Sequence, residues 1–284
     1  MTYRECYEKG SRILNEAGIE ESTLDARLLL EAVCGTNRND LLVHGEQPVE
    51  PEAEEKYFGW IGKRAGRIPL QQLTGEQDFM GLTFTVNENV LIPRQDTEIL
   101  VEEVLKELHD GMRILDMCTG SGCILLSLLH YSNDCEGLGV DLSAEALEVA
   151  GRNVLKVLTP EKAEHAHFLQ SDLFEKVEGK FEIIVSNPPY IASVEIEKLM
   201  PEVRDHEPRM ALDGTEDGLH FYRRIIKEAG KHLVNSGMLF FEIGYDQGQA
   251  VSELMRTGGY REVQVVQDYA GLDRVVLGTY CERN

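Results

Sequence analysis

The chain has 284 residues, enough for one large domain or for a large domain with a smaller one. Its hydrophobic content of 42% and charged content of 27% are ordinary for a globular protein, and no apolar run reaches the roughly 20 residues that cross a bilayer. The net charge of −22 disfavours a protein that grips nucleic acid by its phosphates, because such binding requires a basic surface.

The amino terminus and the cysteines predict a cytoplasmic protein without a metal site. Acidic residues occur early in the chain, and no apolar signal core precedes them. The six cysteines are scattered, with no Cys-x-x-Cys pair, and the eight histidines form no His-x-x-x-His pair. We therefore expect neither a disulfide framework nor a bound metal.

Residues 1–72 are expected to form a small helical domain. Apolar residues recur with helical spacing between Leu24 and Val33, and Gly35 ends this segment. A second helical stretch runs over 51–67. Such a bundle can dock a protein substrate, or it can serve only as a stability module; we take substrate docking as the working hypothesis.

Residues 73–95 are expected to form a β-hairpin that connects two domains. Residues 79–86 have strand composition, and a turn is expected at 87–89. A helix should follow and run to about His109, with Asp96 or Thr97 as its N-cap.

Residues 96–284 predict an α/β domain with a seven-stranded, mostly parallel sheet and helices on both faces. From Met112 onward, candidate strands alternate with helical segments, which is typical of such a sheet. The candidate strands are 113–117, 137–140, 165–170, 181–186, 238–243, 262–266 and 274–277.

A glycine-containing turn follows the first of these strands. It comprises Cys118, Thr119, Gly120, Ser121 and Gly122. Glycines at a strand-to-helix turn allow positive φ and a close approach of the backbone to a ligand. A dinucleotide-binding turn would have a further glycine at the position of Leu125, and no Walker sequence is present.

Acidic residues end three successive strands, at Asp116, Asp141 and Asp172. Asp141 is placed to accept hydrogen bonds from ribose hydroxyls, and Asp172 from an adenine amino group, with Leu173 or Phe174 against the base. This pattern resembles the class I methyltransferases. The resemblance implies S-adenosyl-L-methionine as cofactor and S-adenosyl-L-homocysteine as product.

The fourth strand ends in Asn187-Pro188-Pro189-Tyr190, the most specific string in the sequence. An amide or ring NH2 is a poor nucleophile, because its lone pair is delocalised. The side-chain oxygen of Asn187 and the carbonyl of Pro188 can each accept one NH2 hydrogen and so direct the lone pair at a sulfonium methyl. Pro189 stiffens the turn, and Tyr190 offers a flat face to a planar acceptor. We also expect Asn187 to border the cofactor.

This string resembles that of amino-methylating enzymes acting on adenine, on cytosine or on glutamine side chains. By itself it leaves open an amino-methyltransferase acting on adenine in nucleic acid, although the acidity of the chain disfavours it. A non-catalytic adapter is a further alternative, against which the intact string argues.

Segments along the rest of the chain resemble the peptide chain release factor glutamine methyltransferases. They are Pro69-Leu70-Gln71-Gln72-Leu73-Thr74-Gly75, Phe79-Met80-Gly81, Leu91-Ile92-Pro93-Arg94-Gln95-Asp96-Thr97-Glu98, Glu207-Pro208, Ala211-Leu212-Asp213-Gly214, Asp217-Gly218-Leu219 and Phe241-Glu242-Ile243-Gly244 with Gln247. The resemblance implies methylation of the side-chain amide nitrogen of the glutamine in the Gly-Gly-Gln motif of class 1 release factors, in support of translation termination. It implies a protein partner and no direct nucleic-acid partner, and we expect a monomer.

Carried over by position, 118–122 and Asp141 hold the cofactor, 171–174 border the adenine, and 187–190 hold the glutamine. The chain departs from the family pattern at three places. Cys118 and Thr215 stand where glycine is usual, and Leu173 stands where an aromatic residue is common.

Three residues have open roles. Arg94 is expected either to contact the partner or to pin the connector to the catalytic domain, and Glu242 to lie near the acceptor without touching it. No role is assigned to Thr97.

Overall fold

The computed structural model describes residues 1–282 and divides the chain into two compact units. One unit comprises Met1–Glu76 together with Met200–His206, and the other comprises Gln77–Leu199 and Glu207–Asn284. Each unit has its own hydrophobic core. No helix within residues 1–282 is long and apolar enough to cross a membrane.

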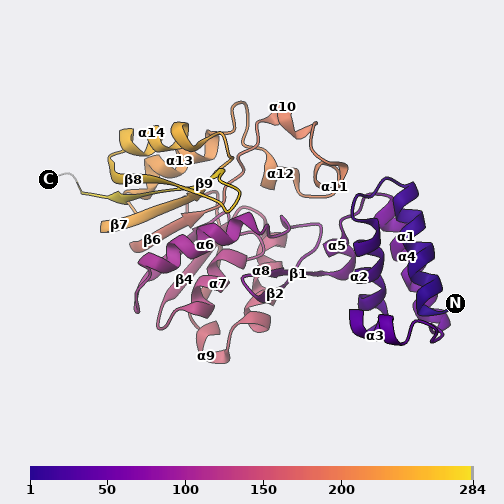
Figure 1. Cartoon of the computed structure of the whole chain (residues 1–284). Coiled ribbons are helices and arrows are strands. Elements are labelled where there is room, and N and C mark those ends of the chain that lie inside the picture. Colours follow the sequence, from indigo (N-terminus) through magenta and orange to yellow (C-terminus); the bar gives the residue numbers. More distant parts are fainter. Residues whose placement is uncertain (283–284) are drawn as a thin grey trace. The chain divides into compact units, whose positions relative to one another are not determined.

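The first unit is a helical bundle, which confirms the helices expected in this region (Figure 1). Thr2 caps the first helix with a capping box: its hydroxyl accepts from the Glu5 amide, and the Glu5 carboxylate accepts from the Thr2 amide. Gly35, with φ +60°, ends the second helix in the left-handed conformation. The helices are α1 (Tyr3–Glu16), α2 (Ser22–Cys34), α3 (Arg38–Val43), α4 (Pro51–Ala65) and α5 (Leu70–Thr74).

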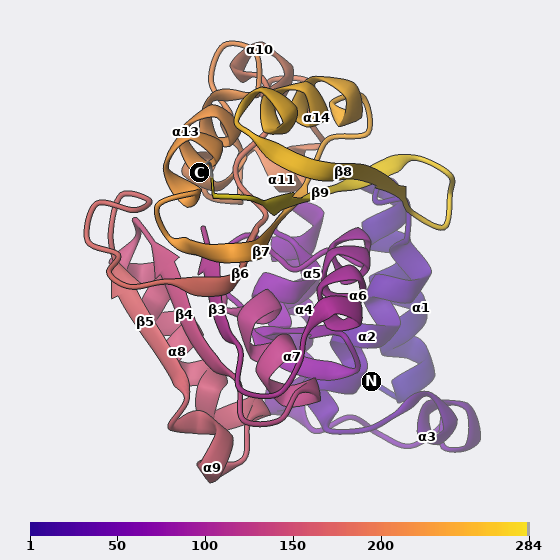
Figure 2. The ribbon, with the colours of Figure 1, turned by 90° about the vertical axis from the view of Figure 1, so that its left-hand side faces the viewer.

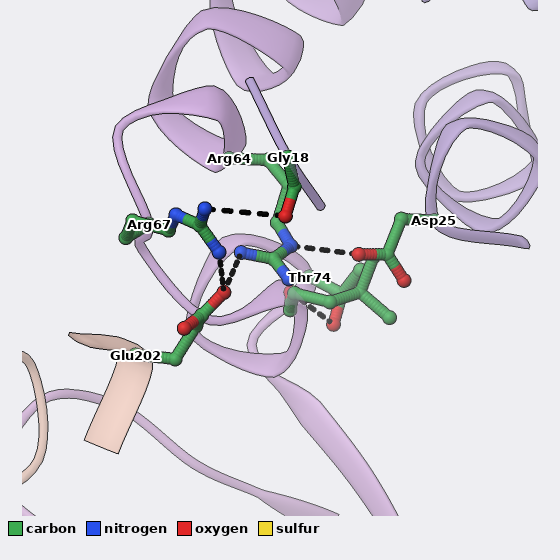
Figure 3. Close-up of polar contacts among 7 residues, drawn as sticks. Gly18, Asp25, Arg64, Arg67, Thr74 and Glu202 are labelled. Carbon is green, nitrogen blue, oxygen red and sulfur yellow. Dashed lines mark hydrogen bonds and ion pairs between the residues drawn. The ribbon is translucent and has the colours of Figure 1, made fainter. Parts of the chain in front are cut away.

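A buried cluster of charges binds the segment Met200–His206 into this bundle (Figure 3). Arg64 donates to Asp25 over 2.7 Å and to Glu202 over 3.1 Å. Glu202, on the short helix α11 (Pro201–Arg204), also accepts from Arg67 over 3.2 Å. The side chains of Arg64, Asp25 and Glu202 are nearly buried, so removal of one of them would leave a buried charge without its partner.

The β-hairpin is formed by β1 (Glu76–Phe79) and β2 (Leu82–Thr85). The turn expected at 87–89 does form, but it is not the turn of the hairpin: the chain reverses at Met80 and Gly81, whose φ angles are +52° and +71°. Two successive positive φ angles give the tight turn that matches the twist of a hairpin. Asn153 accepts from the Thr85 amide and donates to its carbonyl, which ties the hairpin to α8 (Ala144–Val157).

The second unit is built on a seven-stranded sheet, as expected (Figure 2). Its strands lie in the order β5-β4-β3-β6-β7-β9-β8. All neighbours pair in parallel except those of β9, which is antiparallel to both β7 and β8. The strands are β3 (Arg113–Met117), β4 (Glu136–Asp141), β5 (Ala166–Gln170), β6 (Phe181–Ser186), β7 (Leu233–Glu242), β8 (Tyr260–Gln267) and β9 (Asp273–Tyr280).

Both faces of this sheet are buried by helices. Side chains alternate between two cores along each strand: Ile114 packs into one core and Leu115 into the other, and Ile183 and Ile184 divide in the same way. Helices α6 (Asp96–Glu107), α7 (Cys123–Tyr131) and α8 cover one face, whereas α13 (His220–Ala229) and α14 (Gly248–Thr257) cover the other (Figure 1). The short helices α9 (Pro160–Ala163), α10 (Ser193–Ile196) and α12 (Arg209–Leu212) lie in connections.

The start of α6 differs from the expectation. Gln95 is the N-cap residue, and no side chain caps the helix, so the prediction of Asp96 or Thr97 as cap is wrong. Asp96 pairs instead with Arg274 of β9, and Thr97 is turned into the protein with 2% of its surface exposed. Both side chains therefore contact residues distant in the sequence and do not cap the helix.

Candidate active site

A cavity of about 330 Å³ lies at the carboxyl ends of β3, β4 and β6. The strand order runs β3-β4-β5 to one side and continues with β6 on the other, so this edge contains the topological switch point of the sheet. Ligands of open α/β sheets bind at such points. Met117 pairs with Ser186, and the Ser186 hydroxyl donates to the Met117 carbonyl over 2.6 Å, so the turns after β3 and β6 begin side by side.

The turn after β3 uses the left-handed conformation three times, at Cys118 (φ +64°), Gly120 (φ +55°) and Gly122 (φ +78°). Cys118 therefore occupies a conformation that favours glycine. Burial raises the pKa of its thiol, and the carboxylates of Asp141 and Asp116 add to this effect. The thiolate is the reactive form of a cysteine, and a raised pKa disfavours it.

Two carboxylates hold this turn. Asp116 is fully buried and accepts from the Thr119 hydroxyl over 2.5 Å; burial raises its pKa to about 7. Asp141, at the end of β4, accepts from the Gly120 amide and the Ser143 amide, each over 2.9 Å. Burial also raises the pKa of Asp141. Its carboxylate lines the cavity and retains lone pairs for a ligand's hydroxyl groups.

Asp172 and Leu173, which follow β5, line the same cavity. Asp172 forms an ion pair with Arg224 over 2.9 Å, so one of its oxygens already has a partner. Leu173 is buried and has φ +48°. Its side chain gives the cavity an apolar wall.

Residues 187–190, called the acceptor string below, directly follow β6, and two of them line the cavity. Asn187 is partly exposed and lines the cavity, as does the buried Pro189. The amide nitrogen of Asn187 donates to the Thr97 hydroxyl oxygen over 3.4 Å. With its nitrogen bonded to the protein, the side-chain oxygen of Asn187 is available to a ligand.

Tyr190 is fixed by polar contacts. Its hydroxyl donates to Glu242 at the end of β7 over 3.4 Å, and its carbonyl accepts from the side chain of Gln247 over 3.0 Å. Burial and the neighbouring Glu242 carboxylate raise the pKa of its hydroxyl, which therefore remains protonated. The side-chain oxygen of Gln247 accepts from the Gly244 amide, so Gln247 links the acceptor string to the segment that follows β7.

Two glycines allow the segment 213–218 to lie against Tyr190. A Cβ on Gly214 would come within 2.8 Å of the Tyr190 Cα, and a Cβ on Gly218 within 2.3 Å of its carbonyl oxygen. Both distances are shorter than van der Waals contact. Thr215, between them, has φ +70° and is held by the hydrogen bond from the Ser193 amide to its carbonyl. Like Cys118 and Leu173, it is a non-glycine residue in a conformation that favours glycine.

Thr215→Gly is expected to increase the free energy of unfolding by about 0.5–1 kcal/mol, because relief of the left-handed strain exceeds the added entropy of the unfolded chain. Urea unfolding of the full chain measures this change. Thr215→Ala is the matched control: it keeps the Cβ and should give no gain. Equal stabilities of the two variants would contradict the assignment of strain to this position.

The structure brings most of the predicted site residues to one cavity. It is lined by Cys118, Thr119, Gly120, Ser121, Asp141, Asp172, Leu173, Asn187 and Pro189. Gly122, Pro188 and Tyr190 do not line it. Gly122 instead packs closely against Ala150 and Leu126. Within residues 1–282, no three His, Cys, Asp or Glu side chains are grouped to hold a metal.

The cavity also has walls that were not assigned as site residues from the sequence. They include Leu91, Pro93, Arg94, Thr97, Pro208, Met210, Ala211, Asp213 and Phe221. Most of these residues lie within or beside the segments that resemble the release factor glutamine methyltransferases in the sequence analysis. That resemblance is the sequence signal from which they could have been predicted. Arg94 forms an ion pair with Glu207, whose side chain is 1% exposed and also accepts from the Ile92 amide. Arg94 thus pins the strand-to-helix connection within the catalytic unit.

Comparison with known proteins supports the fold. A methyltransferase from Pyrococcus furiosus, 18% identical, has a crystal structure that covers 78% of this chain and 100% of its own, with a TM-score of 0.53. The sequence families that match are the PrmC N-terminal domain over residues 5–75 and the methyltransferase small domain over residues 94–203. The fold is that of a class I methyltransferase, and the cavity lies at the switch point of its sheet.

Sequence relatives show which family within this class the chain belongs to. Release factor glutamine methyltransferases of Moorella thermoacetica and Clostridium acetobutylicum are 43% and 40% identical over 281 residues, and each match covers 98% of this chain and 98% of the relative. The chain belongs to the release factor glutamine methyltransferase family.

Proposed function

We propose that this chain transfers a methyl group from S-adenosyl-L-methionine to the side-chain amide nitrogen of the glutamine in the Gly-Gly-Gln motif of class 1 peptide chain release factors. The observation that carries the proposal is the position of Asn187. It directly follows β6, lines the cavity, and lies beside the glycine turn of the adjacent strand β3. Family membership supports glutamine as the acceptor.

The residues of the cavity fit this cofactor. A Cβ on Gly120 would have no atom within 4 Å, so this residue leaves open space beside the turn. Asp141 would accept from the ribose hydroxyls, and Asp172 and Leu173 would border the adenine. When bound, the cofactor supplies an electrophilic methyl group on a sulfonium centre.

For transfer to occur, the glutamine NH2 has to be oriented toward the methyl group; removal of a proton from it beforehand matters less. The Asn187 oxygen and the Pro188 carbonyl would each accept one hydrogen of the glutamine NH2, which directs the nitrogen lone pair and stabilises the positive charge that develops on it. The amide nitrogen becomes acidic as it gains the methyl group, so no strong general base is required. Tyr190, with its hydroxyl held by Glu242, would support the acceptor turn.

Asp141→Asn is expected to weaken S-adenosyl-L-homocysteine binding about tenfold, because hydrogen bonds to a charged acceptor contribute roughly 1.5–3 kcal/mol. Isothermal titration calorimetry measures the affinity. Asp110→Asn, at an exposed position, is the matched control and should bind as the wild type does. Unchanged affinity in Asp141→Asn would contradict the proposed ribose contact.

The proposed place of action is the cytoplasm, where release factors function. One copy of the chain should suffice, because a single unit provides the described walls of the cavity. The alternative acceptor, adenine in nucleic acid, is not favoured: the chain has 50 acidic and 28 basic residues, which gives it a charge that repels a polyanion.

A further inference from the structure

The direction of the Asn187 amide decides whether the proposed acceptor can be held. An asparagine amide has a donor end and an acceptor end of nearly equal size, and only the oxygen can accept from a glutamine NH2. In the structure the donor end of Asn187 bonds to the Thr97 hydroxyl oxygen over 3.4 Å. Thr97 is 2% exposed, so water does not compete for this contact.

A second contact determines the role of the Thr97 hydroxyl. Glu242, also 2% exposed, ends β7, and the Thr97 hydroxyl acts on its carboxyl group as a hydrogen-bond donor that lowers the pKa. A threonine hydroxyl has one hydrogen to donate, and an ionised carboxylate can only accept. Thr97 therefore donates to Glu242, and its oxygen is left to accept from Asn187.

We propose that Thr97 and Glu242 are positioning residues for glutamine methylation, which together hold the Asn187 oxygen toward the acceptor amide. This proposal rests on the proposed function, since only an NH2 acceptor requires that orientation. Tyr190 joins the same carboxyl group through its hydroxyl, over 3.4 Å. One buried carboxylate thus orients both the first and the last residue of the acceptor string.

The arrangement depends on the charge of Glu242. Burial raises the pKa of this carboxyl group to about 7, against the hydrogen bond from Thr97, the positive charge of Arg274 and the hydrogen bond from Tyr190. The titratable and charged groups around it are Asp96 on α6, Cys123 on α7, Tyr190 after β6, Tyr222 on α13 and Arg274 on β9. As pH falls through about 7, Glu242 gains a proton that it can donate to Thr97, and the direction of the Asn187 amide is no longer imposed.

The test is steady-state transfer of labelled methyl groups to a purified class 1 release factor between pH 6 and 9. Thr97→Val keeps the shape of the side chain and removes its hydroxyl. It should lower kcat about tenfold, the equivalent of one hydrogen bond, and change the KM for the release factor by less than about twofold. Thr97→Ser should restore most of kcat, and Thr257→Val, exposed on α14, should match the wild type.

Glu242→Gln separates positioning from folding. A carboxyl group with a raised pKa favours the folded state below its unfolded pKa and loses this contribution as pH rises through about 7, so removal of its charge should not lower the thermal unfolding temperature at pH 8.5. We expect kcat to fall about tenfold at this pH. The wild type should also lose kcat as the pH falls below 7, and this loss should be absent in Glu242→Gln.

Wild-type kcat in Thr97→Val, or an unchanged pH profile in Glu242→Gln, would overturn the positioning role while the proposed function stands. Equal losses in Thr97→Val and Thr97→Ser, with lowered unfolding temperatures, would also overturn it in favour of a structural role. A wild-type enzyme that leaves the release factor unmethylated would overturn the proposed function and this inference together.

Discussion

Asn187→Ala is expected to lower kcat for methyl transfer to a release factor by about 10²–10³-fold, the usual effect of losing one preorganised hydrogen-bonding group at a reacting centre. The alanine cannot accept from the glutamine NH2, so the nitrogen lone pair is no longer directed. KM should change less than kcat, because the lost interaction strengthens as charge develops on the nitrogen. The measurement is steady-state transfer from labelled S-adenosyl-L-methionine.

Asn133→Ala is the control for this change, since Asn133 is exposed in the connection between α7 and β4. It should retain wild-type kcat. Calorimetry with S-adenosyl-L-homocysteine should show how much of the Asn187 effect comes from cofactor binding. A wild-type rate in Asn187→Ala would show that the acceptor is held by other groups.

Arg64→Ala is expected to lower the free energy of unfolding of the helical unit by about 3–5 kcal/mol, because it leaves two buried carboxylates without their shared partner. The side chains of Arg64, Asp25 and Glu202 are only 10%, 9% and 11% exposed, so water cannot replace the lost guanidinium. Urea unfolding of the full chain, followed by circular dichroism, measures the loss.

Arg4→Ala is the matched control in the same unit. Arg4 pairs with Glu46 over 2.9 Å, but the two side chains are 59% and 74% exposed, so the loss should stay below about 1 kcal/mol. Similar losses in both variants would contradict the importance of burial.

The pH dependence of the Arg64 effect follows from Glu202. Burial would raise the pKa of this carboxyl group, but hydrogen bonds from its own backbone amide, from Arg67 and from Arg64 lower it overall. A lowered pKa stabilises the fold above the unfolded-state value of about 4.3 and loses this contribution as pH falls through the folded value. The difference between wild type and Arg64→Ala should therefore shrink below about pH 4.

The sheet and its site edge were predictable because local sequence determines them. Strands buried on both faces appear as apolar runs, and β3 and β6 begin and end where those runs do. Parallel strands bring their carboxyl ends to one edge, so residues as distant as Cys118 and Asn187 could be expected at one cavity.

The hairpin turn was misplaced because two turn signals compete within a few residues. Asn87-Glu88-Asn89 does form a local turn, in which the Asn87 side chain accepts from the Asn89 amide. The reversal of the hairpin uses Met80 with Gly81, and methionine at positive φ is a weak signal. Packing of the hairpin against α8 stabilises this choice.

Contacts between distant residues could not be predicted from sequence patterns. Glu202 and Arg64 are 138 positions apart, and nothing local marks Met200–His206 as part of the helical unit. Thr97 stands where the sequence predicts a helix cap. In the structure it is buried and accepts a hydrogen bond from Asn187, which is the basis of the positioning role that we propose for it. Such partners follow from the tertiary fold alone.

We propose that the methyl acceptor is the side-chain amide of one glutamine in a release factor. The most direct measurement is methyl transfer from labelled S-adenosyl-L-methionine to a purified class 1 release factor, to the same factor with its Gly-Gly-Gln glutamine changed to alanine, and to duplex DNA. We predict label on the intact factor alone. Label on the DNA, or equal label on both forms of the factor, would contradict the claim.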